Sequence, residues 1–387
     1  MKNKHPFALF YTAILIMATV WSLLDTFVIA DKLAVVDETL ANTSIYTNLA
    51  NTAAANVAAE NALNETANAA DEAALASTPA VTPTSTPAVA ADKPTQTSGS
   101  LAAAADAVAA ASDPASIVDA VAAAGSVDNT LIQNSTGTSM TPVVTDTSYQ
   151  DANIQITIEK IRQYNTDIYI ADVVVSDVAY LKTALAQNTY GKNIKQTTSA
   201  MAAEHQAILA INGDYYGFRN AGFVLRNGVL YRTTARTGSS EALVVNADGN
   251  FEIITESSTD AQTLYDQGAL QVFTFGPGLI NAGKISVTSS SEVSQSMSSN
   301  PRTALGMIAP LHYVFVVSDG RTAQSTGLSL LQLAEVMQAY GCTEAYNLDG
   351  GGSSTMVFNG EVVNNPTDGR SFGERKVSDI IYIGAQL

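Results

Sequence analysis

A sharp change in composition near residue 146 limits how much of this 387-residue chain can fold into a core. Residues 41–145 contain 31 alanines in 105 positions and one aromatic residue, Tyr46, so they can bury little apolar area. Of the 25 glycines, 22 lie after residue 146. We therefore expect residues 147–387 to form one domain, and residues 31–146 to form an Ala/Thr/Pro-rich, largely disordered stalk.

The pattern of the C-terminal part predicts a strand-rich domain. Runs of β-branched and aromatic residues, bounded by Gly, Asn and Asp, predict strands at 153–158, 168–175, 207–211, 242–246, 270–275, 303–308, 312–317, 343–347, 355–358 and 377–383. Helical spacing predicts helices at about 196–205 and 328–340, the second with a capping box from Ser329 to Gln332 and a glycine stop at Gly341. This mixture indicates the α+β class, a single domain with a few packed helices.

The N-terminus carries an apolar segment. Residues 7–24 are uncharged and would span ~27 Å as a helix, close to the thickness of a bilayer core. Lys2 and Lys4 precede this segment and several acids follow it, so residues 1–30 predict a cytoplasmic tip and a single-pass transmembrane signal-anchor, with the C-terminal domain outside the cell. A small-residue site ending at Ala30 leaves the alternative of cleavage and secretion.

Charge and residue counts disfavour several classes of function. The net charge of −17 makes nucleic acid an unsuitable partner. One cysteine, Cys342, excludes an intrachain disulfide. His205 and His312 are too few for a binuclear His/Asp metallophosphoesterase, and the chain lacks the Gly-x-Ser-x-Gly motif of serine hydrolases.

The most specific motif runs from Asn347 to Ser354 and follows a predicted strand. Three consecutive glycines, Gly350, Gly351 and Gly352, precede Ser353, which favours backbone N–H groups held against an anion with Asp349 aimed into the same pocket. The alternative is a sharp turn in which Asp349 hydrogen-bonds its own loop.

A second polar cluster follows the strand at 207–211. It combines Asn212, Asp214, Tyr215 and Arg219, with Arg226 on the next segment. Aromatic rings suit the faces of sugars, and guanidinium groups suit phosphate or carboxylate. The alternative is an ordinary turn with packed tyrosines.

Two further clusters carry arginine. Arg302 opens an otherwise apolar strand, where it either pairs with a carboxylate or holds an anionic ligand. Glu374 and Arg375 lie before the last strand, where a plain charged turn is the alternative. Together, the carboxylates, arginines and glycine loop suit cleavage of a glycosidic bond whose leaving group carries phosphate.

Several motifs occur in an order that resembles the phosphodiester glycosidase family, over about residues 200–387. They are Asn212-Gly213, Gly276-Pro277-Gly278, Arg302-Thr303-Ala304, Gly327-Leu328, Asn347 to Ser354, and Arg375-Lys376-Val377-Ser378. The resemblance implies hydrolysis between a sugar's anomeric carbon and a phosphodiester, releasing the sugar and a phosphate monoester. Because bacterial members are often described as exopolysaccharide-associated, it also implies a phosphate-containing glycan of the cell envelope as substrate.

The physical argument and the resemblance assign similar roles. Asp349 is the expected nucleophile or base, with Asp214 or Glu374 as partner, while Arg302, Arg375 and the glycine-loop amides neutralise phosphate. No cofactor is expected, with a divalent cation such as Ca²⁺ or Mg²⁺ as the alternative.

Two other functions remain open on the sequence. One is a metal-assisted phosphodiesterase in which Asp349, Asp214 and Asp319 or Asp379 hold Ca²⁺ or Mg²⁺. The other is a non-catalytic protein that binds or assembles an anionic polysaccharide through Tyr215, Tyr216 and the arginines.

Overall fold

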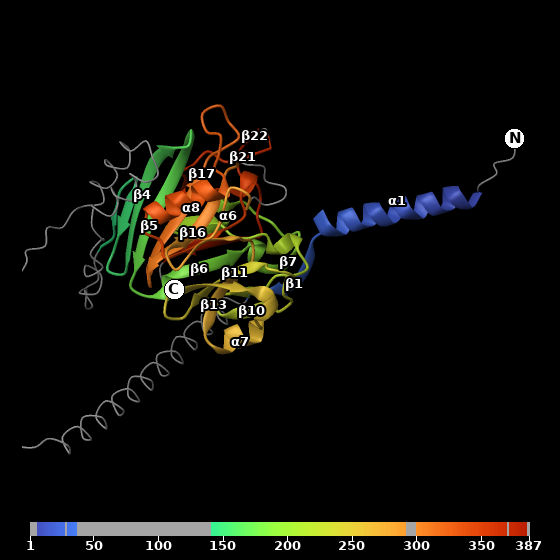
Figure 1. Ribbon diagram of the computed structural model, residues 1–387, viewed down its shortest axis with the longest axis horizontal. Coiled ribbons are helices and arrows are strands. Elements are labelled where there is room, and N and C mark those ends of the chain that lie inside the picture. Colours follow the sequence, from blue (N-terminus) through green and yellow to red (C-terminus); the bar gives the residue numbers. More distant parts are fainter. Residues whose placement is uncertain (1–5, 28, 37–140, 292–298, 370, 385–387) are drawn as a thin grey trace, which may run out of the picture.

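The computed structural model describes residues 6–27, 29–36, 141–291, 299–369 and 371–384. Helix α1 (Pro6–Phe27) projects away from the body formed by the C-terminal part of the chain (Figure 1). Among the described residues, no helix is both long and apolar enough to cross a membrane. The predicted stalk lies largely outside the described residues.

Antiparallel strands form three larger sheets in the described part of the domain. The first has nine strands, in the order β15 (Lys284–Ile285), β14 (Gly278–Asn281), β18 (Glu344–Asn347), β16 (Thr303–Ala309), β17 (His312–Ser318), β5 (Thr166–Val175), β4 (Ile154–Gln163), β3 (Ser148–Gln150) and β2 (Val143–Val144).

The other two larger sheets have five strands each. One runs β10 (Val229–Arg232), β9 (Val224–Arg226), β13 (Ala269–Phe273), β11 (Glu241–Asn246) and β12 (Phe251–Thr255). The other runs β20 (Glu361–Val362), β19 (Met356–Phe358), β8 (Leu209–Asn212), β23 (Asp379–Ile383) and β6 (Leu181–Leu185).

The inner faces of the three sheets meet in one core. Alternating apolar residues of all three sheets pack together there, among them Ile156, Phe315, Ile211, Leu243 and Phe273. This alternation follows from the two-residue repeat of a strand, which turns every second side chain to the same face.

Each of the three helices in the body covers the outer face of a different sheet. Helix α8 (Leu330–Ala339) packs on the nine-stranded sheet, α6 (Thr198–Glu204) on the β8 sheet and α7 (Ala261–Asp266) on the β13 sheet. The capping box of Ser329 and Gln332 is confirmed at the start of α8, and Gly341 has the expected positive φ of 80° after its end.

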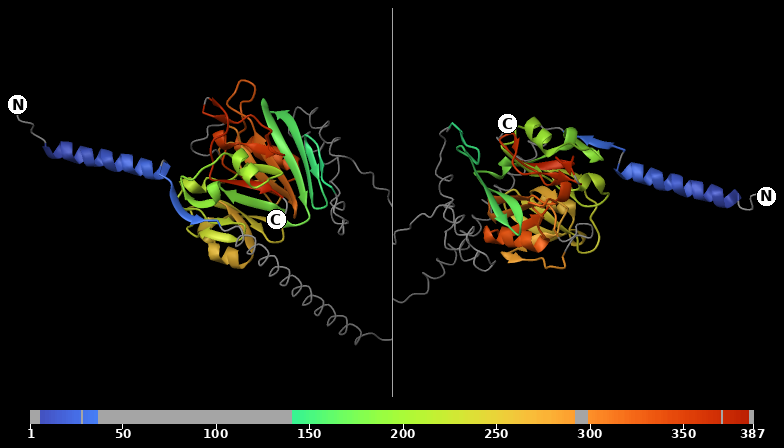
Figure 2. Two further views of the ribbon diagram at one scale, coloured as in Figure 1. Left: turned by 180° about the vertical axis from the view of Figure 1, so that it is seen from behind. Right: turned by 90° about the horizontal axis from the view of Figure 1, so that it is seen from above.

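The predicted strand-rich fold with few helices is confirmed, and each predicted strand overlaps a strand of the structure. One boundary differs from the prediction. Residues 31–35, assigned by composition to the stalk, form strand β1 (Asp31–Val35), which pairs with β7 (Thr189–Lys192) of the domain. Figure 2 shows this strand lying against the body directly after α1.

Shorter elements complete the described chain. A second two-stranded pair joins β21 (Thr367–Asp368) to β22 (Ser371–Phe372). Five short 3₁₀ turns, counted among the described residues, are η1 (Val178–Tyr180), η2 (Ala186–Asn188), η3 (Tyr216–Phe218), η4 (Glu256–Ser258) and η5 (Gly351–Ser353).

Candidate active site

A pocket of about 470 Å³ opens where the loops after β8 and β18 meet the segment before β23. Its walls carry four carboxyl groups, three cationic groups and two aromatic rings. The lining residues are Lys195, Asp214, Tyr215, Phe218, Asp349, Ser353, Asp368, Glu374, Arg375, Lys376, Val377 and Ser378. Acids and bases therefore share one concave site, as expected for a ligand that carries both a sugar and an anionic group.

Asp349 reaches this pocket from the end of β18. Ser353 Oγ donates a hydrogen bond of 2.7 Å to Asp349 Oδ2, and the Gly350 amide also donates to this carboxylate. Desolvation outweighs these donors and raises the pKa of Asp349 to about 6. The side chain therefore both bonds its own loop, as the turn alternative predicted, and faces the pocket.

The three glycines permit close packing around this loop. A Cβ at Gly350 would lie 2.9 Å from the Pro301 carbonyl oxygen, and one at Gly352 would lie 2.6 Å from Asp368 Oδ1. The Gly351 amide donates to the Pro301 carbonyl at 2.8 Å. This amide is thus used inside the protein, which departs from the predicted row of amides turned toward an anion.

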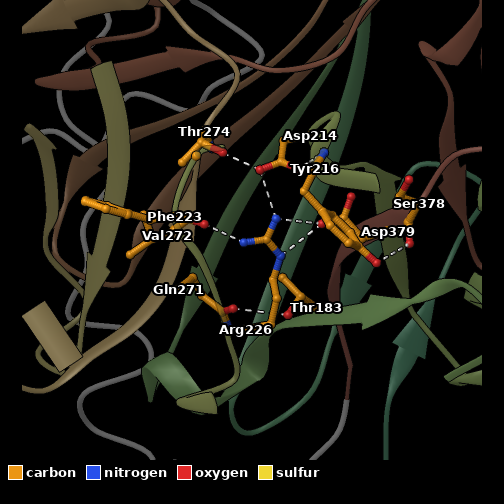
Figure 3. Close-up of polar contacts among 12 residues, drawn as sticks. Thr183, Asp214, Tyr216, Phe223, Arg226, Gln271, Val272, Thr274, Ser378 and Asp379 are labelled. Carbon is orange, nitrogen blue, oxygen red and sulfur yellow. Dashed lines mark hydrogen bonds and ion pairs between the residues drawn. The ribbon is translucent and has the colours of Figure 1, made fainter. Parts of the chain in front are cut away.

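Asp214 belongs to a buried cluster centred on Arg226 (Figure 3). Arg226 Nη2 lies 2.9 Å from Asp214 Oδ2 and 2.8 Å from Asp379 Oδ2. Backbone amides of Thr274 and Tyr216 also donate to the Asp214 carboxylate, at 2.9 and 2.8 Å.

The local environment shifts the pKa values of the two carboxyl groups that flank Arg226 in opposite directions. Burial works to raise the pKa of Asp214, but Arg226 and the two amides together hold it below its ordinary value. Burial raises the pKa of Asp379 in spite of the neighbouring guanidinium. Since one guanidinium faces two buried carboxyl groups, the two carboxyl groups titrate as a pair.

Two other pocket acids also have close partners. Glu374 accepts hydrogen bonds from both the amide and the hydroxyl of Ser199, in the first turn of α6. Asp368 Oδ1 accepts from Arg375 Nε and Nη2 at 2.9 and 2.7 Å, in a half-exposed ion pair. Asp349 differs from Asp214 and Asp368, because the donors that hold it are neutral.

Like the three glycines, three predicted ligand-binding side chains lie outside the pocket lining, and they bond backbone groups instead. Asn212 Nδ2 donates to the Asp349 carbonyl at 2.6 Å, so it positions the loop that carries this acid. Arg302 is buried, and its Nε donates to the Leu328 carbonyl at 2.9 Å. Arg219 donates to the Thr274 carbonyl and stacks on Tyr215.

The structure adds pocket residues that the sequence did not single out as site residues. Lys195 lies over the Phe218 ring at 5.5 Å, and Phe218 stacks on Tyr215 with ring centroids 4.6 Å apart. Lys376 and Ser378 were quoted only within a motif. Lys195 follows β7 by three residues, so only the long-range packing of β7 against η3 brings it to the site.

Among the described residues, no group of three or more His, Cys, Asp or Glu side chains is arranged to hold a metal ion. Asp319, a ligand in the metal alternative, accepts hydrogen bonds from the Asn365 amide at 2.8 Å and its side chain at 3.1 Å. The four acids of the metal alternative therefore have separate partners. Asp349 bonds its own loop at the pocket, Asp214 and Asp379 pair with Arg226, and Asp319 bonds Asn365.

Comparison with known proteins gives a consistent family. Residues 205–384 match the family model described as phosphodiester glycosidase. An SPbeta prophage-derived uncharacterized protein of Bacillus subtilis is 30% identical over 200 residues, covering 50% of this chain and 30% of that protein. Mouse N-acetylglucosamine-1-phosphodiester alpha-N-acetylglucosaminidase is 40% identical over 67 residues, covering 17% of this chain and 13% of that enzyme.

A solved structure is also similar. The catalytic domain of zebrafish N-acetylglucosamine-1-phosphodiester alpha-N-acetylglucosaminidase aligns with a TM-score of 0.49 and 20% identity, covering 60% of this chain and 83% of that one. The present chain spans less than a third of the length of the curated relatives named above. The resemblance seen in the sequence is confirmed by the family match: residues 205–384 of the chain are similar to the phosphodiester glycosidase family.

Proposed function

We propose that the domain hydrolyses the bond between the anomeric carbon of a sugar and a phosphodiester. The supporting observation is that Asp349 faces the pocket and accepts its hydrogen bonds from neutral donors, while Arg375 and Arg219 attract it electrostatically. Positive charge develops on the sugar ring as a glycosidic bond breaks, and a carboxylate that faces the pocket can stabilise that charge. Asp349 is therefore the nucleophile, or the base that activates water.

The cationic groups of the pocket provide for the other half of the substrate. Lys195, Arg375 and Lys376 line the pocket and are suited to neutralise the departing phosphate. In this proposal Arg302 does not bind the phosphate, in contrast to the prediction from the sequence, because its Nε donates to the Leu328 carbonyl. Since a phosphate monoester leaves readily, neutralising its charge contributes more than protonating it.

Asp214 and Glu374 support the site by other means. Asp214 fixes the Tyr216 amide and Arg226, and Glu374 fixes the start of α6. Asp214, which is paired with Arg226, is less free than Asp349 to exchange its partners for a substrate. The substrate-stacking surface is Tyr215 with Phe218, whose rings lie together at the pocket wall.

We also propose that the natural substrate is a phosphate-containing glycan of the cell envelope or an exopolysaccharide. Its support is the apolar N-terminal segment, whose flanking charges favour a domain outside the cytoplasm, held by an anchor or released after Ala30.

The test is to incubate the full-length protein with a panel of sugar-1-phosphate diesters and to identify the products. Free sugar plus a phosphate monoester supports the proposal. Binding of anionic glycans with no turnover on any diester would favour the binding-protein alternative instead. Activity that EDTA abolishes and a divalent cation restores would favour the metal-assisted phosphodiesterase.

A further inference from the structure

Residues 29–36 attach to the domain directly after α1, along the edge of β7. β1 pairs with β7 in antiparallel register, with Asp31 opposite Lys192 and Val35 opposite Thr189. The contact extends beyond the strand at both ends, because Asn193 Nδ2 donates to the Ile29 carbonyl at 2.7 Å and the Val36 amide donates to Asn188 at 2.8 Å.

The surface that receives β1 is shaped for it at Gly191. A Cβ at Gly191 would lie 2.0 Å from the Asp31 carbonyl oxygen, closer than a carbon atom can approach. The backbone of Gly191 is not left-handed, so its conformation alone does not require glycine. The close approach of β1, together with the Ile194 side chain, whose Cδ1 would lie 2.8 Å from that Cβ, explains the glycine.

Strand β7 in turn holds the pocket wall. The Asn193 amide donates to the Gly217 carbonyl at 3.0 Å, and Tyr190 stacks on Tyr216 with centroids 5.5 Å apart. η3 thereby has two links to β7, and Phe218 of that turn lines the pocket together with Lys195. Val36 packs against the small cluster that contains Tyr190 and Tyr216, which adds a direct apolar link.

The strand itself contributes little apolar burial. Leu33 is 56% exposed and Val35 is 76% exposed. Backbone hydrogen bonds therefore provide most of the attachment, and such a strand can be detached without emptying a core.

We propose that residues 29–36, by pairing with β7, brace the pocket wall formed by η3 and Lys195, so that the segment following α1 keeps the active site ordered. The expected fall in turnover depends on the proposed function. The expected rise in hydrogen exchange of the pocket wall does not depend on it. On either side of residues 37–140, Val36 packs against the domain and β2 pairs with β3 of the nine-stranded sheet.

The test uses full-length protein and two independent ways of detaching β1. Gly191→Val places side-chain atoms where the Asp31 carbonyl lies, and the double change Leu33→Pro with Ala34→Pro disrupts β1 without altering the domain. The matched control is Val143→Pro with Val144→Pro in β2, an exposed strand at the far edge of the nine-stranded sheet.

Hydrogen exchange by mass spectrometry gives the readout. Both detaching variants should expose the amides of residues 31–36 and increase exchange at least tenfold in residues 189–195 and 215–218, and the control should not. Combining the two changes should add little, because each removes the same contact. The second variant keeps the test decisive should Gly191→Val fail to fold.

Two results would overturn the proposal. One is unchanged exchange in residues 189–195 and 215–218 after residues 31–36 have become exposed. The other is continued protection of residues 31–36 in the Gly191→Val protein. In the same variants, kcat/KM on a sugar-1-phosphate diester should fall severalfold. Absence of turnover in the unmodified protein would contradict the proposed function alone and leave the exchange result interpretable.

Discussion

At the scale of single residues, the environment of Asp349 predicts how activity depends on pH. Desolvation raises its pKa to about 6, so the side chain is ionised above this pH and protonated below it. A nucleophile or base must be ionised, and kcat/KM should therefore fall tenfold per unit as pH drops below about 6. A pH profile without an acidic limb near 6 would argue against Asp349 in this role.

Asp368 leads to a second prediction, because its carboxylate forms an ion pair with Arg375. Removing its charge by Asp368→Asn should free the guanidinium for phosphate and lower KM for diesters, while Arg375→Gln should raise KM. Glu252→Gln, an exposed acid of β12, serves as the matched control. An unchanged KM in both pocket variants would mean that Arg375 does not contact the phosphate.

The sequence located the acids of the pocket better than its cations. Asp349, with Ser353, was recognisable because a glycine-rich run after a strand has few purely structural uses. Arg302 and Asn212 looked equally suited to a ligand, yet both bond backbone carbonyls. Residue type alone does not reveal whether a polar group faces a cavity or the chain, and Lys195 reaches the site only through tertiary packing.

At the scale of elements, Arg226 joins β9, β23 and the loop after β8. Arg226→Met should destabilise the domain by about 3–5 kcal/mol, because it leaves two buried carboxyl groups without their cation. Arg162→Met is the control, since its ion pair with Asp167 is half-exposed and should contribute about 0–1 kcal/mol. Urea unfolding of both variants gives the comparison; equal losses would contradict a central role for Arg226.

The elements that the sequence predicted are the ones with local signals. β16 is a largely apolar run, β17 is a run of β-branched and aromatic residues, and the capping box of α8 spans four consecutive residues. β1 was not predicted, because its partner β7 lies far away in the chain. β9 was also not predicted, although it forms a hairpin with β10 across Asn227-Gly228, which is a local turn signal.

At the scale of the whole molecule, the orientation of the N-terminal segment remains a prediction from charge. Lys2 and Lys4 should keep the N-terminus inside, so protease added to intact cells should digest the chain after about residue 40. Immunoblotting for the C-terminal domain would detect this. A domain that is protected until the cells are lysed would contradict the proposed location.

The central claim concerns which bond breaks, and an isotope experiment tests it most directly. Turnover of a sugar-1-phosphate diester in ¹⁸O-labelled water should place ¹⁸O in the free sugar when the bond at the anomeric carbon is cleaved, and Asp349→Asn should reduce the rate at least ~10²-fold. Mass spectrometry of the two products locates the label. The account predicts ¹⁸O in the sugar and none in the phosphate monoester. Label in the phosphate would show attack at phosphorus and would contradict a glycosidase.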